Sequence, residues 1–268
     1  MIAKANCKIN IGLDVLRRRV DGFHDLATVM FPVRGLYDTV EVTACDEVQF
    51  VATGLAVDCP AEENLCLRAY HLMRAHYGVG GVRIKLDKRV PFGAGLGGGS
   101  SDATAVIRSV NDLFELRLSE AELIARAAEL GSDTAFFVRN TPQYCTGRGE
   151  VLSPISLDLA GRYLVIIKPD GGISTREAYA GVTPALPPIP LRERLMQDLS
   201  LWQQSIKNDF EPSVFRQYPA IALAKQQLLA CGALYASMSG SGSAVYGIFD
   251  CAEKSEKLQR LSPFVYQL

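Results

Sequence analysis

Residues 90–103 read Val90-Pro91-Phe92-Gly93-Ala94-Gly95-Leu96-Gly97-Gly98-Gly99-Ser100-Ser101-Asp102-Ala103, and this stretch carries the strongest signal in the chain. Its five glycines fall within seven positions, where the backbone can turn its N–H groups toward one point without obstruction by a Cβ atom. An amphipathic helix is predicted directly behind them over 101–115, with Ser100 or Ser101 as its N-cap. A helix N-terminus adds unpaired N–H donors and partial positive charge, so the stretch predicts an exposed loop that binds an anion such as phosphate.

Two familiar nucleotide-binding motifs do not account for this loop. A Walker A loop ends in Gly-Lys-Ser or Gly-Lys-Thr, and no lysine follows Gly98 or Gly99. Residues 93–98 satisfy the dinucleotide pattern G-x-G-x-x-G, but that pattern requires a buried parallel strand before it and an acidic residue about 20 positions later. The preceding segment 82–86 alternates apolar and charged residues, which is typical of a half-solvated antiparallel strand. We therefore interpret the dinucleotide match as accidental.

The composition is that of a soluble globular protein. The chain has 268 residues, of which 48% are hydrophobic and 21% charged, and its formal net charge is −1. This length suffices for one large domain or two, and the charge offers no surface for nucleic acid. Lys4, Lys8 and Asp14 interrupt the apolar pattern of the first twenty residues, so we expect no signal peptide. No apolar run approaches the roughly 20 residues that a membrane span needs. We expect a cytoplasmic protein without a membrane or nucleic-acid partner, as a monomer or homodimer.

The cysteines and histidines indicate neither a disulfide framework nor a structural metal site. Seven cysteines, at 7, 45, 59, 66, 145, 231 and 251, form no C-x-x-C pair. Their odd number favours reduced, mostly buried thiols. The three histidines, at 24, 71 and 76, show no paired spacing of metal ligands.

Strands and helices are predicted to mix without a regular βαβ alternation, which favours an α+β fold. The first strand places Ile9, Ile11, Leu13 and Val15 on one face and Lys8, Asn10 and Asp14 on the other. Further strands are expected at 38–43, 47–52, 82–86, 163–167 and 244–249, and helices at 63–77, 101–115, 119–130, 191–206 and 212–230. The predicted domains are 1–155 and 156–268.

Two charged residues are candidates for phosphoryl transfer, which needs positive charge on the migrating group and often a carboxylate near the attacking hydroxyl. Lys8 lies on the polar face of the first strand, and Asp133 is expected at a helix N-terminus, where the helix dipole favours a carboxylate. A solvated strand lysine and an aspartate N-cap remain equally open alternatives. The turn 239–243, Ser239-Gly240-Ser241-Gly242-Ser243, is by itself more typical of a hairpin than of a site. Paired with the glycine loop, it could close around the phosphates of a nucleotide or around a substrate.

Several segments, in this order along the chain, resemble the GHMP small-molecule kinases. They are Ala5-Asn6-Cys7-Lys8-Ile9-Asn10, Asp21-Gly22-Phe23-His24, Gly95-Leu96-Gly97-Gly98-Gly99-Ser100-Ser101-Asp102-Ala103, Gly131-Ser132-Asp133 and Ser239-Gly240-Ser241-Gly242-Ser243-Ala244. Within that family the segments are most similar to members that phosphorylate the 2-hydroxyl of the cytidine diphosphate conjugate of methylerythritol, in the non-mevalonate route to isoprenoids. The resemblance implies a two-domain fold with the active site in the cleft between the domains.

The resemblance also implies roles for individual residues. Lys8 and Asp133 would be the catalytic pair, with Asp133 accepting the proton of the attacking hydroxyl. ATP would bind, with Mg²⁺, to Pro91, Gly93, Gly95, Leu96, Gly97, Gly98, Gly99, Ser100 and Ser101. The substrate would contact Asn10, Phe23, His24, Asp133, Thr175 and Tyr179, with His24 hydrogen-bonded to the cytosine and the rings of Phe23 and Tyr179 stacked on its two faces.

Two alternatives remain open. Another kinase of the same family, of the homoserine or mevalonate type, would share the glycine loop. Homoserine kinases generally lack an aspartate where Asp133 stands, and mevalonate kinases lack the Gly-aromatic-His turn at 22–24. A non-catalytic nucleotide-binding protein of this fold would not need both Lys8 and Asp133.

Overall fold

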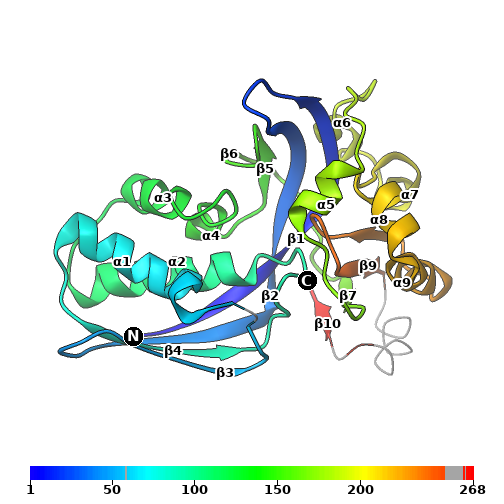
Figure 1. The fold of residues 1–268 in the computed structure, drawn as a ribbon. Coiled ribbons are helices and arrows are strands. Elements are labelled where there is room, and N and C mark those ends of the chain that lie inside the picture. The colour runs from blue at the N-terminus through cyan, green and yellow to red at the C-terminus, as the bar shows by residue number, and fades with distance from the viewer. Residues whose placement is uncertain (58, 251–261, 263) are drawn as a thin grey trace. The chain divides into compact units, whose positions relative to one another are not determined.

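The computed structural model describes residues 1–57, 59–250, 262 and 264–268. These residues form two compact units, each made of separate stretches of chain. Unit 1 contains Met1–Lys8, Pro32–Phe92 and Gly97–Thr141, and unit 2 contains Ile9–Phe31, Gly93–Leu96 and Pro142–Leu268. Both units mix helices with mostly antiparallel strands, which confirms the α+β class (Figure 1). The predicted domains, 1–155 and 156–268, are continuous stretches of chain, whereas each unit combines separate stretches. These domains stay a prediction.

The first two strands are long and run through both units. Strand β1 spans Ile2–Arg18 and pairs with β2, which spans His24–Ala44. The prediction placed a strand only at 38–43 of this region and missed its first half. There Leu26, Ala27, Val29 and Met30 are all buried, so both faces of the strand are apolar and the alternation that signals a strand is lost.

Unit 1 packs four helices on one side of a small sheet. Strand β4 (Val82–Lys88) is antiparallel to β2, with Ile84 opposite Val42, and parallel to β3 (Gln49–Gly54). Its alternating burial confirms the half-solvated antiparallel strand predicted at 82–86. Figure 1 shows α1 (Leu65–Tyr77) and α2 (Gly98–Leu113) above this sheet, with α3 (Glu120–Ala128) and α4 (Phe136–Arg139) farther out. The predicted capping box from Ser119 to Glu122 opens α3, as expected.

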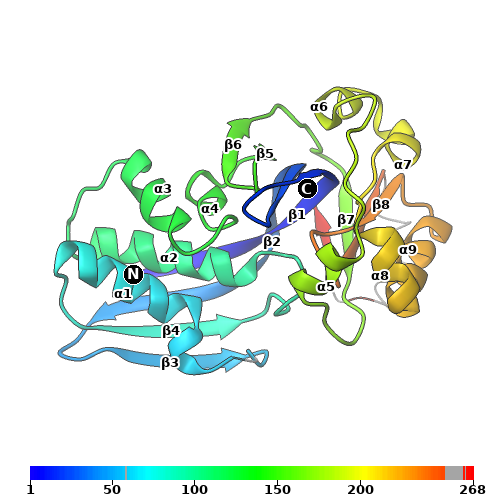
Figure 2. The ribbon, with the colours of Figure 1, turned by 45° about the horizontal axis from the view of Figure 1, so that its top comes forward.

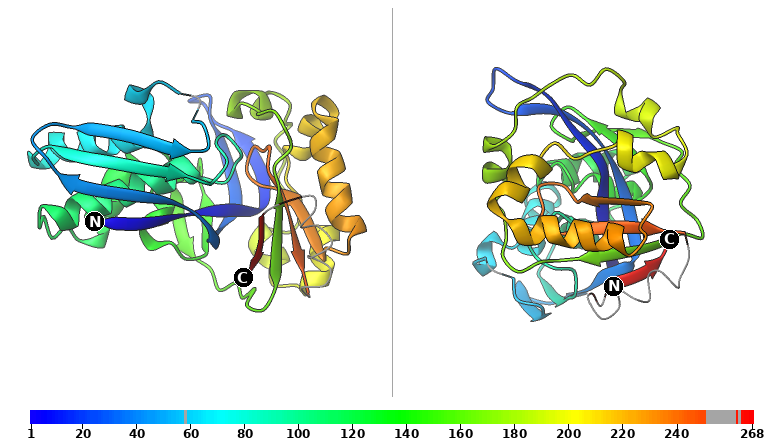
Figure 3. Two further views of the ribbon diagram at one scale, coloured as in Figure 1. Left: turned by 90° about the horizontal axis from the view of Figure 1, so that it is seen from below. Right: turned by 90° about the vertical axis from the view of Figure 1, so that its right-hand side faces the viewer.

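Unit 2 contains two groups of strands. In the first, β2 pairs with β5 (Gln143–Thr146), which pairs with β6 (Val151–Pro154). The second is an antiparallel sheet in the order β10-β7-β9-β8. Its strands span Tyr163–Ile167 (β7), Tyr235–Met238 (β8), Val245–Phe249 (β9) and Phe264–Gln267 (β10), and only β8 and β10 were not predicted. Figure 3 shows helix α9 (Pro219–Ala230) lying across this sheet, and Ile221, Ala224 and Leu228 bury its apolar face there.

Two of the predicted helices in unit 2 are wrong in extent. The segment 191–206 forms α6 (Leu191–Arg194), a 3₁₀ turn (Leu199–Leu201) and α7 (Trp202–Ser205), because the Asp198 side chain accepts from Ser200 N and starts a new turn. The segment 212–230 divides into α8 (Glu211–Gln217) and α9, because Pro219 has no N–H for a continuous helix and begins the second one instead. Figure 2 shows both groups of short helices in unit 2, together with α5 (Thr175–Ala180).

Cys7 and Cys66 are fully buried, and burial raises the pKa of both thiols. This agrees with the predicted reduced state. A second 3₁₀ turn, Ala61–Glu63, precedes α1. Cys251, one of the seven cysteines considered above, lies outside the described residues.

Candidate active site

Lys8 and Asp133 form an ion pair in unit 1. Lys8 Nζ lies 3.1 Å from Asp133 Oδ2, and the lysine side chain is only 3% exposed. The alternative of a solvated strand lysine is therefore wrong. A buried ammonium group is costly unless a charged partner compensates it, and Asp133 supplies that partner. The ion pair brings together one cation and one carboxylate, which are the two kinds of group expected above for phosphoryl transfer.

The position of Asp133 differs from the expected helix N-terminus. Helix α4 begins at Phe136 with Ala135 as its N-cap, so Asp133 lies in the turn before the helix and is not a cap. A four-residue helix also has little dipole to offer. The interaction that holds the Asp133 carboxylate is therefore its contact with Lys8, not the helix dipole. Its side chain is 34% exposed, which leaves the carboxylate open to an acceptor hydroxyl.

The glycine loop leads directly into α2, and the helix begins earlier than predicted. Gly97, with φ +70°, is the N-cap, and no side chain caps this end. The prediction of Ser100 or Ser101 as N-cap is thus wrong, because the glycines continue into the first helical turn. The first N–H groups of α2 have no intrahelical acceptor and no capping side chain, which is the arrangement that binds phosphate.

Gly97 also brings the loop close to Lys8. A Cβ atom at this position would lie 3.0 Å from Lys8 Cε and 3.1 Å from Phe137 Cζ. Any side chain here would therefore displace the lysine stem. The loop is exposed only in part, since Phe92 and Gly93 are exposed whereas Ala94, Leu96 and Gly98 are buried.

Three buried charged residues, Lys88, Asp38 and Asp102, lie beside the loop and form a triad that the sequence analysis missed. Lys88 Nζ donates to Asp38 Oδ2 and, at 2.7 Å, to Asp102 Oδ2, and all three side chains are almost completely buried. Asp38 Oδ1 accepts from Val90 N at 2.7 Å, which fixes the start of the loop. Lys88 and Asp102 flank the glycines, but nothing in the sequence connects them to Asp38.

Burial controls the protonation of this triad. Desolvation raises the pKa of Asp102 to about 8, the positive charge of Lys88 opposes that rise, and the negative charge of Asp38 adds to it. Burial lowers the pKa of Lys88, but the negative charges of Asp102 and Asp38 outweigh this effect and raise the pKa overall. Two carboxylates and one ammonium group leave one excess negative charge in the interior, so the triad favours retaining a proton on the carboxylates.

A pocket of about 280 Å³ opens beside the start of α2 in unit 1. Val57, Leu65 and Phe92 provide apolar walls, and Asn64, Gly99 and Asp102 line the polar part. Asn64 is the N-cap of α1, where its side chain accepts from Cys66 N at 2.9 Å. The sequence analysis did not identify this pocket, because its walls come from three separate segments.

In unit 2, the turn 239–243 connects β8 to β9 and contacts the other end of the glycine loop. Ser239 Oγ donates to Gly95 O at 2.8 Å and accepts from Asn10 N at 3.2 Å. A Cβ atom at Gly95, whose φ is +74°, would lie 2.0 Å from Ser239 O. The turn is therefore both a hairpin and a support of the loop. Asn208 Nδ2, missed by the sequence analysis, donates to Met238 O and Gly240 O at 2.9 and 2.8 Å and holds the turn from the far side.

The residues assigned to the substrate belong to unit 2, with the exception of Asp133, and the structure shows a direct contact between two of them. The rings of His24 and Tyr179 are stacked, with centroids 5.0 Å apart. Asn10 is 4% exposed and donates from Nδ2 to Thr28 Oγ1 at 3.1 Å. Thr175 is exposed and begins α5, whose capping box at Ser174 helps to orient the helix that carries Tyr179.

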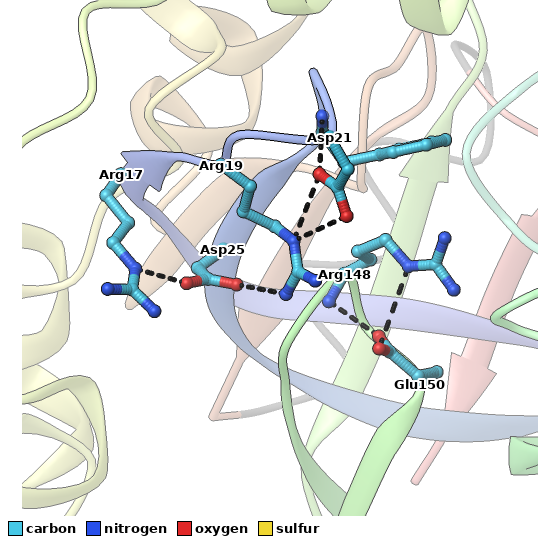
Figure 4. A network of polar contacts seen from close by, with 7 residues as sticks. Arg17, Arg19, Asp21, Asp25, Arg148 and Glu150 are labelled. Atoms are coloured by element: carbon cyan, nitrogen blue, oxygen red, sulfur yellow. Dashed lines mark hydrogen bonds and ion pairs between the residues drawn. The ribbon is translucent and has the colours of Figure 1, made fainter.

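The Phe23 side chain is 54% exposed and has a cationic neighbour, Arg148, that sequence reasoning did not single out. The Arg148 guanidinium lies 5.0 Å from the ring centroid, a cation–π distance. Figure 4 shows Arg148 beside Glu150 and facing the turn that contains Asp21. The sequence around Arg148 shows only the turn Gly147-Arg148-Gly149, which is typical of many hairpins. The cytosine sandwich between Phe23 and Tyr179 stays a prediction.

Ion pairs hold the turn before His24 in place, as Figure 4 shows. Arg19 Nη1 donates to Asp25 Oδ1 at 2.9 Å, and Arg17 Nε donates to the other oxygen. Hydrogen bonds from Arg17 and Arg19 lower the pKa of Asp25. Asp21 Oδ1 accepts from Phe23 N at 3.1 Å, so the aromatic residue is positioned by the same network.

No helix within the described residues is long and apolar enough to cross a membrane. Among those same residues, no three His, Cys, Asp or Glu side chains come together as a metal site.

The chain matches two family models, described as the GHMP kinases N terminal domain, over residues 64–141, and the GHMP kinases C terminal, over 191–264. A 4-diphosphocytidyl-2-C-methyl-D-erythritol kinase of Parabacteroides distasonis is 44% identical over 93% of this chain and 92% of its own length. The Bacteroides fragilis protein of the same name is 42% identical over 100% and 98%.

Solved structures agree with these matches. A crystal structure of 4-(cytidine 5'-diphospho)-2C-methyl-D-erythritol kinase has a TM-score of 0.82 and 31% identity, and the match covers 99% of this chain and 97% of that one. Homoserine kinase from Cytophaga hutchinsonii has a TM-score of 0.71 at 22% identity, covering 97% and 93%, which shows the shared fold alone. The glycine loop, the Lys8–Asp133 pair and these matches together establish that the chain belongs to the GHMP kinase family.

Proposed function

We propose that this protein transfers the γ-phosphoryl group of ATP to the 2-hydroxyl of 4-diphosphocytidyl-2-C-methyl-D-erythritol, in the non-mevalonate route of isoprenoid biosynthesis. The observation that carries the chemistry is the buried Lys8 Nζ, 3.1 Å from Asp133 Oδ2 and in contact with Gly97 of the phosphate loop. The substrate is supported by the names of relatives that are 42–44% identical over nearly the whole chain.

The residues of unit 1 would bind the nucleotide. The pocket lined by Val57, Leu65 and Phe92 has apolar walls suited to a purine, and it ends at Gly99, where α2 begins. Phosphate oxygens would accept from the first N–H groups of α2. Mg²⁺ would neutralise charge on those oxygens, and the proposed loop residues 91–101 would hold the phosphates in line for transfer.

Asp133 and Lys8 would perform the proton and charge chemistry. Asp133 Oδ2 or its partner oxygen would accept the proton as the hydroxyl oxygen attacks phosphorus and the bond to ADP breaks. Lys8 would hold the carboxylate in place and stabilise the charge that develops on the transferred group. The products would be ADP and the 2-phosphorylated substrate.

The aromatic residues of unit 2 would recognise the cytosine. His24 would donate or accept a hydrogen bond at the edge of the base, and Tyr179 and Phe23 would offer stacking faces. His24 covers the Tyr179 ring in the structure. Binding of the base would then require the His24 ring to move from that face.

An assay of ADP release with three acceptor alcohols tests this proposal. We expect turnover with the cytidyl conjugate and none above the background without acceptor for homoserine or mevalonate. Comparable turnover of either of these would refute the substrate and leave a kinase. ADP release with none of the three would favour the non-catalytic alternative. A cytoplasmic location, a monomeric or dimeric state and the absence of nucleic-acid and membrane partners remain predictions.

A further inference from the structure

A second pocket of unit 1, of about 340 Å³, lies on a different face of α2 from the one that meets Gly99. Ser101, Thr104, Ala105 and Arg108 line it, and they recur every three or four residues, so they share one helix face. Gly99 and Asp102 line the first pocket from another face. The second pocket is therefore distinct from the proposed purine site, and Ser101, the last residue of the proposed phosphate loop, is the one residue of that loop that lines it.

Positive charge dominates the lining of the second pocket. Lys4, Arg34, Arg108 and Arg139 contribute to it, and none of its described lining residues is acidic. Arg139 Nε donates to Glu120 Oε1 at 2.9 Å. For Lys4, Arg34 and Arg108, the described part of the chain places no carboxylate within ion-pair distance. Lys4 Nζ lies over the Tyr37 ring, 4.6 Å from its centroid, so the two cations of the pocket that the described residues leave without a charged or aromatic partner are Arg34 and Arg108.

Backbone carbonyls orient two of these cations. Arg34 Nη2 donates to Asn140 O at 3.4 Å, and Arg108 Nη2 donates to Val138 O. Both carbonyls lie at the C-terminal end of α4, so the arginines help to cap that helix. Capping uses one N–H from each guanidinium group, which has five donors. The remaining donors of both groups are available to a planar or tetrahedral anion, which arginine binds in bidentate fashion.

The rest of the pocket is preformed. Asn6, 7% exposed, and Asn140 bond to each other through both amides, at 3.1 and 2.6 Å. Phe137 and Val138 provide an apolar wall. We propose that this pocket binds a small organic phosphate, whose phosphate group contacts Arg34 and Arg108 and whose apolar part lies against Phe137. This inference does not depend on the identity of the acceptor substrate.

Calorimetric titration with inorganic pyrophosphate tests the proposal. The whole protein is first saturated with Mg²⁺ and a non-hydrolysable ATP analogue, so that the glycine loop is occupied. We expect pyrophosphate to bind the saturated protein. We also expect the double variant Arg34→Gln/Arg108→Gln to weaken that binding at least tenfold, while Arg34→Lys/Arg108→Lys weakens it less because the charges remain.

A matched control removes the same charge elsewhere in unit 1. Arg74→Gln/Arg83→Gln changes two exposed arginines that do not line the pocket, and it should leave the affinity within twofold. The thermal midpoint of each variant checks its fold, and Arg34→Gln alone replaces the double variant if the latter is unfolded. No binding to the saturated protein, or equal losses in the pocket and control variants, would overturn the proposal.

Discussion

Lys8 Nζ and Asp133 Oδ2 lie 3.1 Å apart although the two residues are 125 positions apart in the sequence, and the lysine carries almost no exposed surface while the carboxylate is one-third exposed. This asymmetry agrees with the different roles that we propose for the two charges. The lysine is held in the protein interior beside the glycine loop, and the carboxylate faces outward, where an acceptor hydroxyl can reach it.

Replacing the carboxylate should remove proton transfer and spare nucleotide binding. We expect Asp133→Asn to lower kcat by about two to four orders of magnitude, the usual contribution of a general base. The Kd for ATP should change little. Lys8→Met should lower kcat to a similar extent, and the double variant should be little worse than either single one, because the two residues act as a unit. Steady-state kinetics and ATP titration check this, and an Asp133→Asn variant with more than a tenth of wild-type kcat would exclude the proposed role.

Two glycines of the loop provide a matched test of close packing. Gly93 (φ +62°) and Gly97 (φ +70°) have similar backbone conformations, but only Gly97 has neighbours that a Cβ atom would strike. Gly93→Ala should lower the free energy of unfolding by about 1–2 kcal/mol, because alanine would have to adopt the left-handed backbone conformation of this position. Gly97→Ala should cost more and should also lower kcat, because its Cβ atom displaces Lys8. Equal stability and equal kcat for the two variants would show that the contact with Lys8 is unimportant.

His24 should affect the acceptor and not the nucleotide. We expect His24→Ala to raise the KM for the cytidyl substrate about tenfold, which corresponds to one lost hydrogen bond of about 1.4 kcal/mol. The KM for ATP should stay within twofold. His71→Ala, on the exposed face of α1, is the matched control and should change neither value. A His24→Ala variant whose KM for ATP rises as much as that for the substrate would argue against cytosine recognition.

The buried triad predicts a dependence of stability on pH. The folded-state pKa of Asp102, about 8, lies above the ordinary value of 3.8, so the folded protein binds more protons than the unfolded chain between these values. This contribution to stability is complete below about pH 4 and is lost as the pH rises toward 8. Thermal midpoints measured from pH 5 to 8 should therefore fall less in Asp102→Asn than in the wild type. Asp112→Asn, exposed on the same helix, should keep the wild-type slope, and identical slopes in all three proteins would contradict the prediction.

Local sequence patterns were enough to predict the features of the fold and of the site that lie within one segment of the chain. The glycine run, the capping box at Ser119 and the alternation at 82–86 depend on neighbours a few residues apart, and each is visible in the sequence. The resemblance in these segments was likewise sufficient for the family. The start of α2 was misplaced because serine is the better N-cap by propensity. Gly97 takes that position, where φ is +70° and a Cβ atom would lie only 3.0 Å from Lys8 Cε and 3.1 Å from Phe137 Cζ, so that these side chains would have to shift.

Long-range contacts account for what the sequence did not reveal. Asp38 accepts a hydrogen bond from Lys88, 50 positions away, and Asn208 donates one to Gly240, 32 positions away. In the second pocket of unit 1, the cations Lys4, Arg34 and Arg108 come from β1, β2 and α2. No periodicity links such residues, because their proximity results from strand pairing and helix packing. From the chain alone came the phosphate loop, the fold class and the catalytic candidates. Only the tertiary structure decided whether Lys8 is solvated or buried beside a carboxylate. The free-energy cost of desolvating its ammonium group arises only when the folded chain surrounds that group.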